Sequence, residues 1–130
     1  MEPSKISVVI VSGSLERLQM AAMVASVGAV SGNHVHVFLS MNALACFKLG
    51  TDATPPAEGA FGELMAGKKI PSFRSLIEQA VELGDAKVSP CSMAMDVMAI
   101  ESSALPSYFG PPLGLTKFLH DARDTQVFTF

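Results

Sequence analysis

The sequence contains only two cysteines, Cys46 and Cys91, which lie far apart in the chain. It does not open with the basic and apolar segments of a secretory signal, so a framework of disulfide bonds is not expected. We therefore predict that both cysteines are free thiols in a reducing compartment, the cytoplasm.

Long apolar runs and clusters of positive charge are also missing. The longest apolar stretch, 20–30, has 11 residues, whereas a membrane-spanning helix needs about 20. The 9 lysines and arginines are scattered through a chain of net charge −3. No basic stripe is therefore available to neutralise nucleic-acid phosphates. The sequence predicts neither a membrane span nor a nucleic-acid partner.

Apolar residues, in contrast, are abundant. Of the 130 residues, 49% are hydrophobic and only 16% are charged. A chain of this length is expected to form one domain, residues 1–130. A sheet covered by helices on both faces would account for this composition, and so would a surface reserved for partner proteins. We expect both features.

Predicted strands alternate with predicted helices along the chain. Short β-branched apolar runs indicate the strands, and apolar residues at helical spacing indicate the helices. The strands are predicted at 6–11, 34–40, 86–90 and 125–130, and the helices at 15–30, 41–50, 72–84, 91–100 and 115–124. Alternation at this spacing predicts an α/β fold, in which helices cover both faces of a mostly parallel sheet.

Two segments rich in proline and glycine interrupt the alternation, at about 51–71 and about 104–114. The first is predicted to be a mobile loop with one helical turn around 63–65. A loop of this length is usually functional or mobile. We expect it to lie over the ligand-binding edge of the sheet.

Parallel sheets bind ligands at the carboxyl ends of their strands. Three predicted strand ends lead into short polar loops, at 12–14, 40–42 and 90–92. If these strands are neighbours, the three loops meet at one edge. We predict a substrate pocket there, lined by Ser12, Gly13, Ser14, Met41, Asn42, Ser92, Met93, Met95 and Asp96.

Cys91 follows a predicted strand directly and opens a predicted helix. Exposed backbone amides and the helix dipole favour the thiolate at such a place, and the thiolate is the nucleophilic form. The alternative is simple packing, because free cysteine is among the most buried residue types. Asp96 is a general acid–base group, a carboxylate paired with a lysine or arginine from elsewhere, or an acid of the first turn that interacts with the helix dipole.

The remaining candidates have simpler explanations. Cys46 is expected to be a buried thiol, with the alternative that it resolves a disulfide with Cys91. His34 and His36 alternate on one strand without a third ligand nearby, so a solvated strand entry is expected and no metal site. The turn at 12–14 matches no nucleotide-binding motif, although its amides would suit a small oxyanion such as thiosulfate. We expect no cofactor.

Three segments of the sequence resemble the DsrE/DsrF-like family. They are SVVIVSGSLERLQMAAMVASVGAVSGNHVHVFLSMNALACFK, LIEQAVELGDAKVSPCSMAMDVMAI and LGLTKFLHDARDTQVFTF. Residues 91–99 match the signature Cys-[ST]-Met-[ST]-Met-Asp-[LV]-Met-Gly except at Ala94 and Ala99. A second departure is the stretch 108–114, which replaces the usual short strand and turn before the last helix.

This resemblance implies a single Rossmann-like domain with a sheet of about five strands, assembled into trimers or hexamers. It also implies sulfur transfer. Cys91 would carry a persulfide or thiosulfonate derived from a small sulfur oxyanion or polysulfide, and would pass it to a TusA-like carrier protein. Cys46 matches no motif of the family.

Two alternatives to sulfur transfer stay open on the residues themselves. One is a non-enzymatic oligomeric binding or assembly module, in which Cys91 serves only for packing. The other is a thiol redox switch formed by Cys46 and Cys91.

Overall fold

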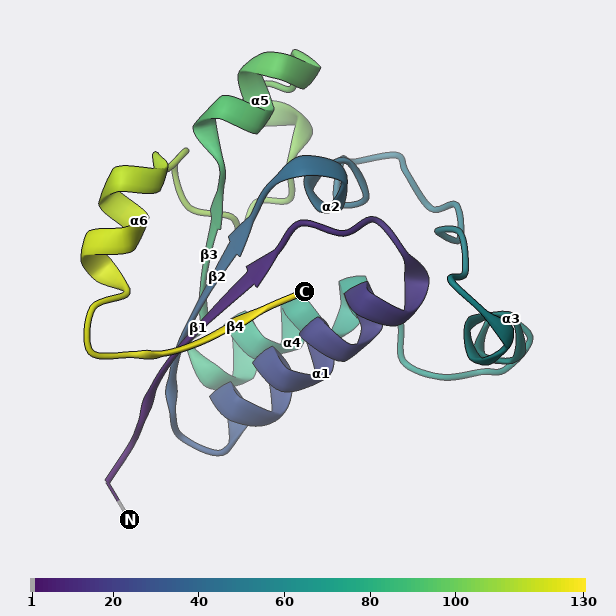
Figure 1. The fold of residues 1–130 in the computed structure, drawn as a ribbon, viewed down its shortest axis with the longest axis horizontal. Helices are drawn as coiled ribbons and strands as arrows, with labels where there is room; N and C mark the ends of the chain where they lie inside the picture. The colour runs from purple at the N-terminus through teal and green to yellow at the C-terminus, as the bar shows by residue number, and fades with distance from the viewer. Residues whose placement is uncertain (1) are drawn as a thin grey trace.

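The computed structural model describes residues 2–130, which are built around one parallel sheet (Figure 1). Its strands are β1 (Lys5–Ile10), β2 (His34–Leu39), β3 (Lys87–Pro90) and β4 (Gln126–Thr129). Their order in the sheet is β3-β2-β1-β4, and every neighbouring pair is parallel. The predicted α/β fold with a parallel sheet is confirmed.

The prediction of about five strands was wrong, because the sheet has 4. On the outer side of β3 the chain returns through one hydrogen bond, from the N–H of Gly110 to the carbonyl of Val88 at 2.7 Å, and one isolated parallel bridge between Cys91 and Leu113. The two preceding residues, Pro111 and Pro112, have no backbone N–H to donate. Two consecutive prolines therefore reduce the expected strand to a single bridge.

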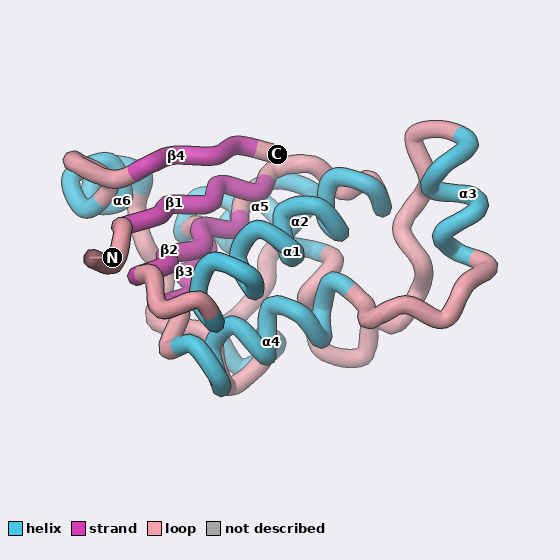
Figure 2. The backbone as a smooth tube through the Cα atoms, turned by 90° about the horizontal axis from the view of Figure 1, so that it is seen from below, coloured by secondary structure: helices cyan, strands magenta, loops and turns pink. Residues whose placement is uncertain are grey.

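Helices α1 (Leu15–Val30) and α4 (Phe73–Gly84) cover one face of the sheet (Figure 2). The buried face of α1 is rich in alanine, which lets α4 approach closely. At the closest point, a Cβ atom on Gly84 would lie 2.5 Å from the Cβ of Ala29, so only glycine fits there. Ser72 caps α4 as predicted, its hydroxyl accepting a backbone N–H at 3.1 Å.

The opposite face of the sheet carries a thinner layer. Helix α6 (Leu115–Asp121) packs there through Phe118, whose ring stacks on Phe38 with centroids 4.5 Å apart. Strand β4 forms one edge of the sheet, and all of its residues are exposed. Helices on both faces are therefore confirmed, but the second layer leaves part of the sheet open.

The remaining helices are short. They are α2 (Met41–Ala45), α3 (Ala60–Ala66), α5 (Ser92–Met98) and a 3-10 turn at Ser102–Ala104. Helix α3 extends further on both sides than the single turn predicted at 63–65. No helix in the described part of the chain is both long and apolar enough to cross a membrane.

Ala99 ends α5 in the left-handed conformation, with φ of 54°, where the DsrE/DsrF-like signature has glycine. This conformation costs a residue with a Cβ atom roughly 1 kcal/mol. Ala99 is exposed, so its methyl group adds little packing. We predict that Ala99→Gly raises the free energy of unfolding by up to about 1 kcal/mol, measured by urea denaturation.

Ala66→Gly is the matched control for this substitution. Ala66 is the exposed last residue of α3 and is not among the residues with positive φ. Glycine there should leave the stability unchanged or lower it. A loss of stability in Ala99→Gly would contradict the assignment of backbone strain to Ala99.

Candidate functional site

The ends of three neighbouring strands meet at one edge of the sheet. The N–H of Cys91, after β3, donates to the carbonyl of Leu39 on β2 at 2.8 Å. On the other side of β2, a Cβ atom on Gly13 would lie 3.0 Å from the Cβ of Asn42. The structure therefore brings together the predicted loops at 12–14, 40–42 and 90–92.

Cys91 lies where β3 passes into α5, and the backbone on both sides of it is tied down. Its carbonyl accepts the N–H of Met95 at 3.0 Å, and the N–H of Ser92 donates to the carbonyl of Leu113 at 3.0 Å. The side chain of Cys91 is only 5% exposed and belongs to the core. The thiol is thus well positioned but covered, and a reagent reaches it only after the covering residues move.

The other predicted pocket residues divide into buried and exposed groups. Met95 lies in the core with Cys91, whereas Met93 is 48% exposed and Asp96 also faces solvent. Met41 is exposed at the same sheet edge and has a left-handed φ of 52°, which is uncommon for a non-glycine residue. Backbone strain of this kind is found often at functional sites.

The second thiol, Cys46, lies just past α2 and is half-buried. Its Sγ donates to the carbonyl of Asn42 at 3.5 Å, and its own carbonyl accepts the Nε–H of Arg74 at 2.8 Å. Burial raises the pKa of the Cys46 thiol, and the positive charge of Arg74 opposes this shift. Cys46 and Cys91 are both free thiols. A raised pKa makes Cys46 less thiolate-like at neutral pH.

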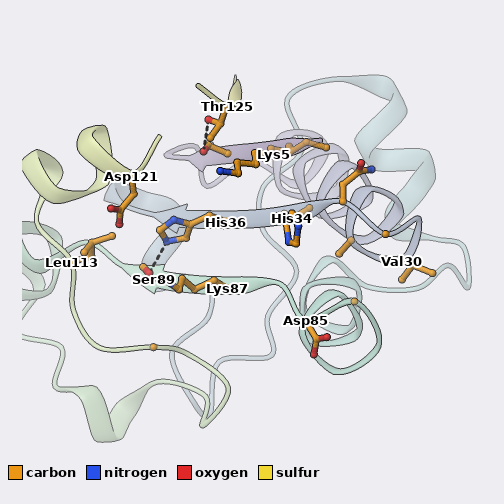
Figure 3. Close-up of a pocket in the computed structure, with 18 of the residues that line it drawn as sticks. Lys5, Val30, His34, His36, Asp85, Lys87, Ser89, Leu113, Asp121 and Thr125 are labelled. Atoms are coloured by element: carbon orange, nitrogen blue, oxygen red, sulfur yellow. Dashed lines mark hydrogen bonds between the residues drawn. The ribbon is translucent and has the colours of Figure 1, made fainter. Parts of the chain in front are cut away.

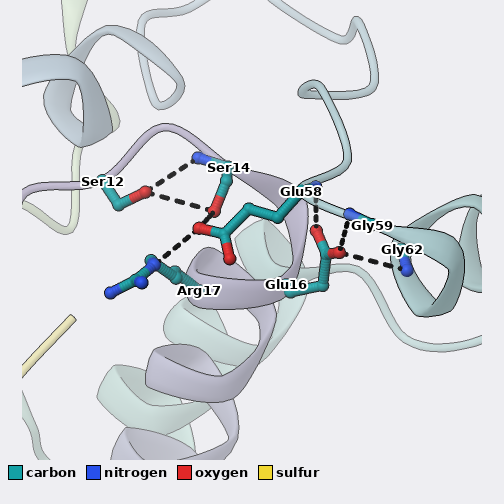
Figure 4. Close-up of polar contacts among 7 residues, drawn as sticks. All are labelled: Ser12, Ser14, Glu16, Arg17, Glu58, Gly59 and Gly62. Atoms are coloured by element: carbon teal, nitrogen blue, oxygen red, sulfur yellow. Dashed lines mark hydrogen bonds and ion pairs between the residues drawn. The ribbon is translucent and has the colours of Figure 1, made fainter.

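The segment 51–71 is fastened to the beginning of α1 (Figure 4). The carboxylate of Glu16 accepts the backbone N–H groups of Glu58 at 2.8 Å, Gly59 at 2.9 Å and Gly62 at 3.2 Å. These hydrogen bonds lower the pKa of Glu16, and the bond from Glu58 contributes most. Within residues 2–130, no hydrogen bond joins this segment to Cys91. The segment 51–71 is therefore attached next to the loop 12–14, at one end of the sheet edge.

Glu58 completes this attachment. Its carboxylate accepts the hydroxyl of Ser14 at 2.7 Å and pairs with Arg17. Ser12 in turn accepts the N–H of Ser14 at 3.1 Å. Two of the predicted substrate-binding serines are thus engaged in holding the segment 51–71. The role of Glu16 was not predictable from the sequence, because its three amide partners lie far away in the chain.

A groove of about 770 Å³ opens on the sheet face that α6 leaves partly uncovered (Figure 3). Its floor carries basic side chains from three strands, which are Lys5, His34, His36 and Lys87. Cys91 does not line this groove, although Ser89, two positions earlier in the chain, does. No group of His, Cys, Asp and Glu suited to hold a metal ion is present in the described residues.

His36 is half-buried in the groove rather than solvated as predicted. Its Nε2 lies 2.8 Å from the Oγ of Ser89, and its ring meets that of Phe118 with centroids 5.4 Å apart. Burial lowers the pKa of His36, the positive charge of Lys87 lowers it further, and Asp121 partly opposes both. The signal in the sequence that points to this polar face is the alternation of polar and apolar residues along β2, which recurs at 5–7 in β1 and 87–89 in β3.

Comparison with protein families identifies the chain. The sequence model of the DsrE/DsrF/DrsH-like family matches residues 56–130, more than half of the sequence. The matched region includes Cys91 and the signature around it. The chain belongs to the DsrE/DsrF/DrsH-like family, which is associated with sulfur relay.

Two solved structures share the fold over nearly the whole chain. The YchN protein from E. coli is 16% identical, with a TM-score of 0.69, over 99% of this chain and 100% of its own. MTH1491 from Methanobacterium thermoautotrophicum, described as a protein of unknown function, is 5% identical, with a TM-score of 0.72, over 98% of this chain and 99% of its own. No curated protein matches the sequence. At these identities the likeness establishes the fold alone.

We predict that the free energy of unfolding falls as the pH is lowered through 6.5, and that His36 causes part of the fall. The pKa of His36 in the folded protein lies below its ordinary value of 6.5. The unfolded chain therefore binds a proton that the folded chain resists, so stability is highest above pH 6.5 and is lost from there toward the lowered pKa. Urea denaturation between about pH 7.5 and about pH 5.5 measures this dependence.

His36→Gln tests the assignment. Glutamine does not titrate and can still hydrogen-bond to Ser89, so the loss of stability at low pH should become smaller. His120→Gln, at an exposed position of α6, is the control and should keep the wild-type dependence. The same dependence in His36→Gln as in the wild type would rule out His36 as its source.

Proposed function

We propose that the protein is a sulfur carrier that holds sulfane sulfur on Cys91 and passes it to a TusA-like carrier protein. The observation that carries this proposal is the placement of Cys91. It stands between β3 and α5 at the carboxyl edge of a parallel sheet, within the signature Cys-Ser-Met-Ala-Met-Asp. Ligands of parallel α/β sheets bind at this edge. Membership of a family associated with sulfur relay supports the same assignment.

The proposed transfer conserves electrons. The Cys91 thiolate attacks the sulfane sulfur of a polysulfide or of thiosulfate and forms a new S–S bond. The donor's own bond to that sulfur breaks, and the shortened polysulfide or sulfite leaves with the electron pair. A thiolate of the carrier then attacks the outer sulfur, and Cys91 leaves as the thiolate. A thiosulfonate would reach Cys91 by the same kind of exchange, from a partner that already carries it.

Access to the thiol is the step that the fold must supply. Cys91 is 5% exposed, and the segment beside it is held by one bridge, at Leu113, and one hydrogen bond, from Gly110 to Val88. Movement of the loop 104–114 would break that bridge without disturbing the four-stranded ladder. We expect the loop to move when a partner protein docks at this edge.

We predict that the wild-type protein incubated with polysulfide or thiosulfate gains the mass of one or more sulfur atoms at Cys91, detected by mass spectrometry of the intact chain and its peptides. Cys46→Ser should gain the same adduct, because the pKa of Cys46 is raised and the residue is not required. Cys91→Ser should gain none. An equal adduct in Cys91→Ser, or no adduct in the wild type, would exclude the proposal.

Assembly is a second candidate function, favoured by an apolar surface on α1 and α3. The exposed side chains on it are Met20 at 52%, Met23 at 45%, Val27 at 66%, Phe61 at 72% and Leu64 at 65%. Several of them line a second groove of about 770 Å³, between α3 and α1. Clusters of exposed apolar side chains usually mark protein–protein contacts. We propose that copies of this chain associate through the patch into a trimer or hexamer.

We predict that Val27→Glu shifts the protein to a smaller species in size-exclusion chromatography with light scattering, because a charge would then be buried in the interface. Leu119→Glu on α6 is the matched control, with its side chain 59% exposed outside the patch. It should keep the wild-type size. A wild type that is monomeric, or equal dissociation of both variants, would argue against assembly through α1.

A further inference from the structure

The groove on the open sheet face (Figure 3) has no part in the sulfur chemistry proposed above. Its volume of about 770 Å³ falls within the usual range of small-molecule sites. Strands β1, β2 and β3 form its floor, α6 forms one wall, and the carboxyl ends of α1 and α4 form the far wall. The fold therefore builds a cavity here from segments that are distant in sequence.

Basic side chains gather in pairs on the floor of this groove. The strand register places Lys5 opposite His34, and His36 opposite Lys87. Side chains opposite one another in a sheet share a face, and like charges so placed destabilise the sheet. At neutral pH the two lysines carry the positive charge of these pairs, since the pKa of His36 lies below its ordinary value, and a negatively charged group among them would be favoured.

Within the described part of the chain, neither lysine of the floor forms an ion pair, although Lys87 lies near enough to Asp121 to help lower the pKa of that carboxyl. Two ion pairs are formed within residues 2–130, and they are Arg17–Glu58 and Lys117–Asp121. Lys5 and Lys87 belong to neither, although the chain has 12 aspartates and glutamates and only 9 lysines and arginines. In a chain with an excess of acids, two positive charges stay available to a ligand at this place.

Two acids in the lining limit where an anion can sit. Asp121 on α6 interacts with His36, but Lys117 holds its carboxylate at 2.8 Å. Asp85 lies just beyond α4, at the end of the groove where the carbonyl ends of α1 and α4 also carry negative potential. The middle of the floor, between Lys5 and Lys87, is therefore the positive part of the groove.

We infer that the middle of this floor binds a small oxyanion with two negative charges, of the class that includes phosphate, sulfate and thiosulfate. Lys5 and Lys87 supply positive charge from the two outer strands of the floor, and His34 and His36 supply ring donors from the strand between them. The hydroxyl of Ser89, 2.8 Å from Nε2 of His36, fixes the orientation of that ring.

The oxyanion site shares strand β3 with the approach to Cys91 but lies apart from the thiol. Lys87 is four positions before Cys91, which is about 13 Å along the strand. Leu113 both lines the groove and pairs with Cys91. If the bound oxyanion is thiosulfate, the site holds a sulfur donor on the molecule that carries the thiol, and that variant alone rests on the proposed function. A phosphoryl group would bind by the same contacts without it.

The test is an NMR titration of isotope-labelled protein with sodium thiosulfate, sulfate and phosphate in parallel, at an ionic strength held constant with chloride. Saturable shifts are expected for the signals of Lys5, His36 and Lys87 with at least one of the three anions. The double variant Lys5→Gln/Lys87→Gln should bind about tenfold more weakly or worse, because two charge-assisted contacts are lost. Tighter binding of thiosulfate or of phosphate identifies whether the site takes a sulfur oxyanion or a phosphoryl group.

Lys68→Gln/Lys69→Gln is the matched control, since it changes the net charge equally and lies in the segment 51–71, outside the groove. It should bind like the wild type. Cys91→Ser should also bind the oxyanion, so loss of sulfur loading and loss of oxyanion binding are separate results. The inference is overturned if no anion gives saturable shifts, if both double variants weaken binding equally, or if Cys91→Ser abolishes binding.

Discussion

Backbone hydrogen bonds hold β1, β2 and β3 in one register, and both ends of the sheet depend on it. Ile10 lies opposite Leu39, and Leu39 opposite Pro90, so the three strands finish at the same level and Cys91 comes beside the loops after β1 and β2. The same register gathers the basic side chains of the groove on one face. A slip of one residue would turn every side chain of a strand to the other face. It would place Lys87 against the layer of α1 and α4, where burial of an unpaired charge is prohibitive.

Features that depend on neighbouring residues were predictable from the sequence. Helix α1 occupies Leu15–Val30, as its apolar run and the following Ser-Gly-Asn stop signal indicate. Ser72 caps α4 because a hydroxyl before an amphipathic run meets the free amides of the first turn. The position of Cys91 between a strand and a helix follows from the same local logic, since Val88 and Pro90 are buried in β3 and α5 begins at Ser92. Its burial did not follow, because that depends on the return of Leu113.

What the sequence could not predict arises from contacts between distant segments. Glu16 looks like any acid in a first helical turn until the chain brings three backbone amides to it. His36 looks like a strand residue at the surface until α6 places Phe118 against its ring. The missing strand is a different case, because the sequence itself shows two prolines, Pro111 and Pro112, that have no backbone N–H to donate. The family resemblance favoured five strands there, and the local chemistry opposed it.

The attachment of α3 to the beginning of α1 is separate from the backbone contacts of Cys91. The carboxylates of Glu16 and Glu58 hold the segment that leads into α3, and this segment has no hydrogen bond to Cys91 within residues 2–130. Loss of the Glu16 carboxylate would free three backbone amides beside the exposed side chains of Phe61 and Leu64 and leave the sheet register intact. The apolar surface of α3 can therefore shift without any change in the backbone around Cys91.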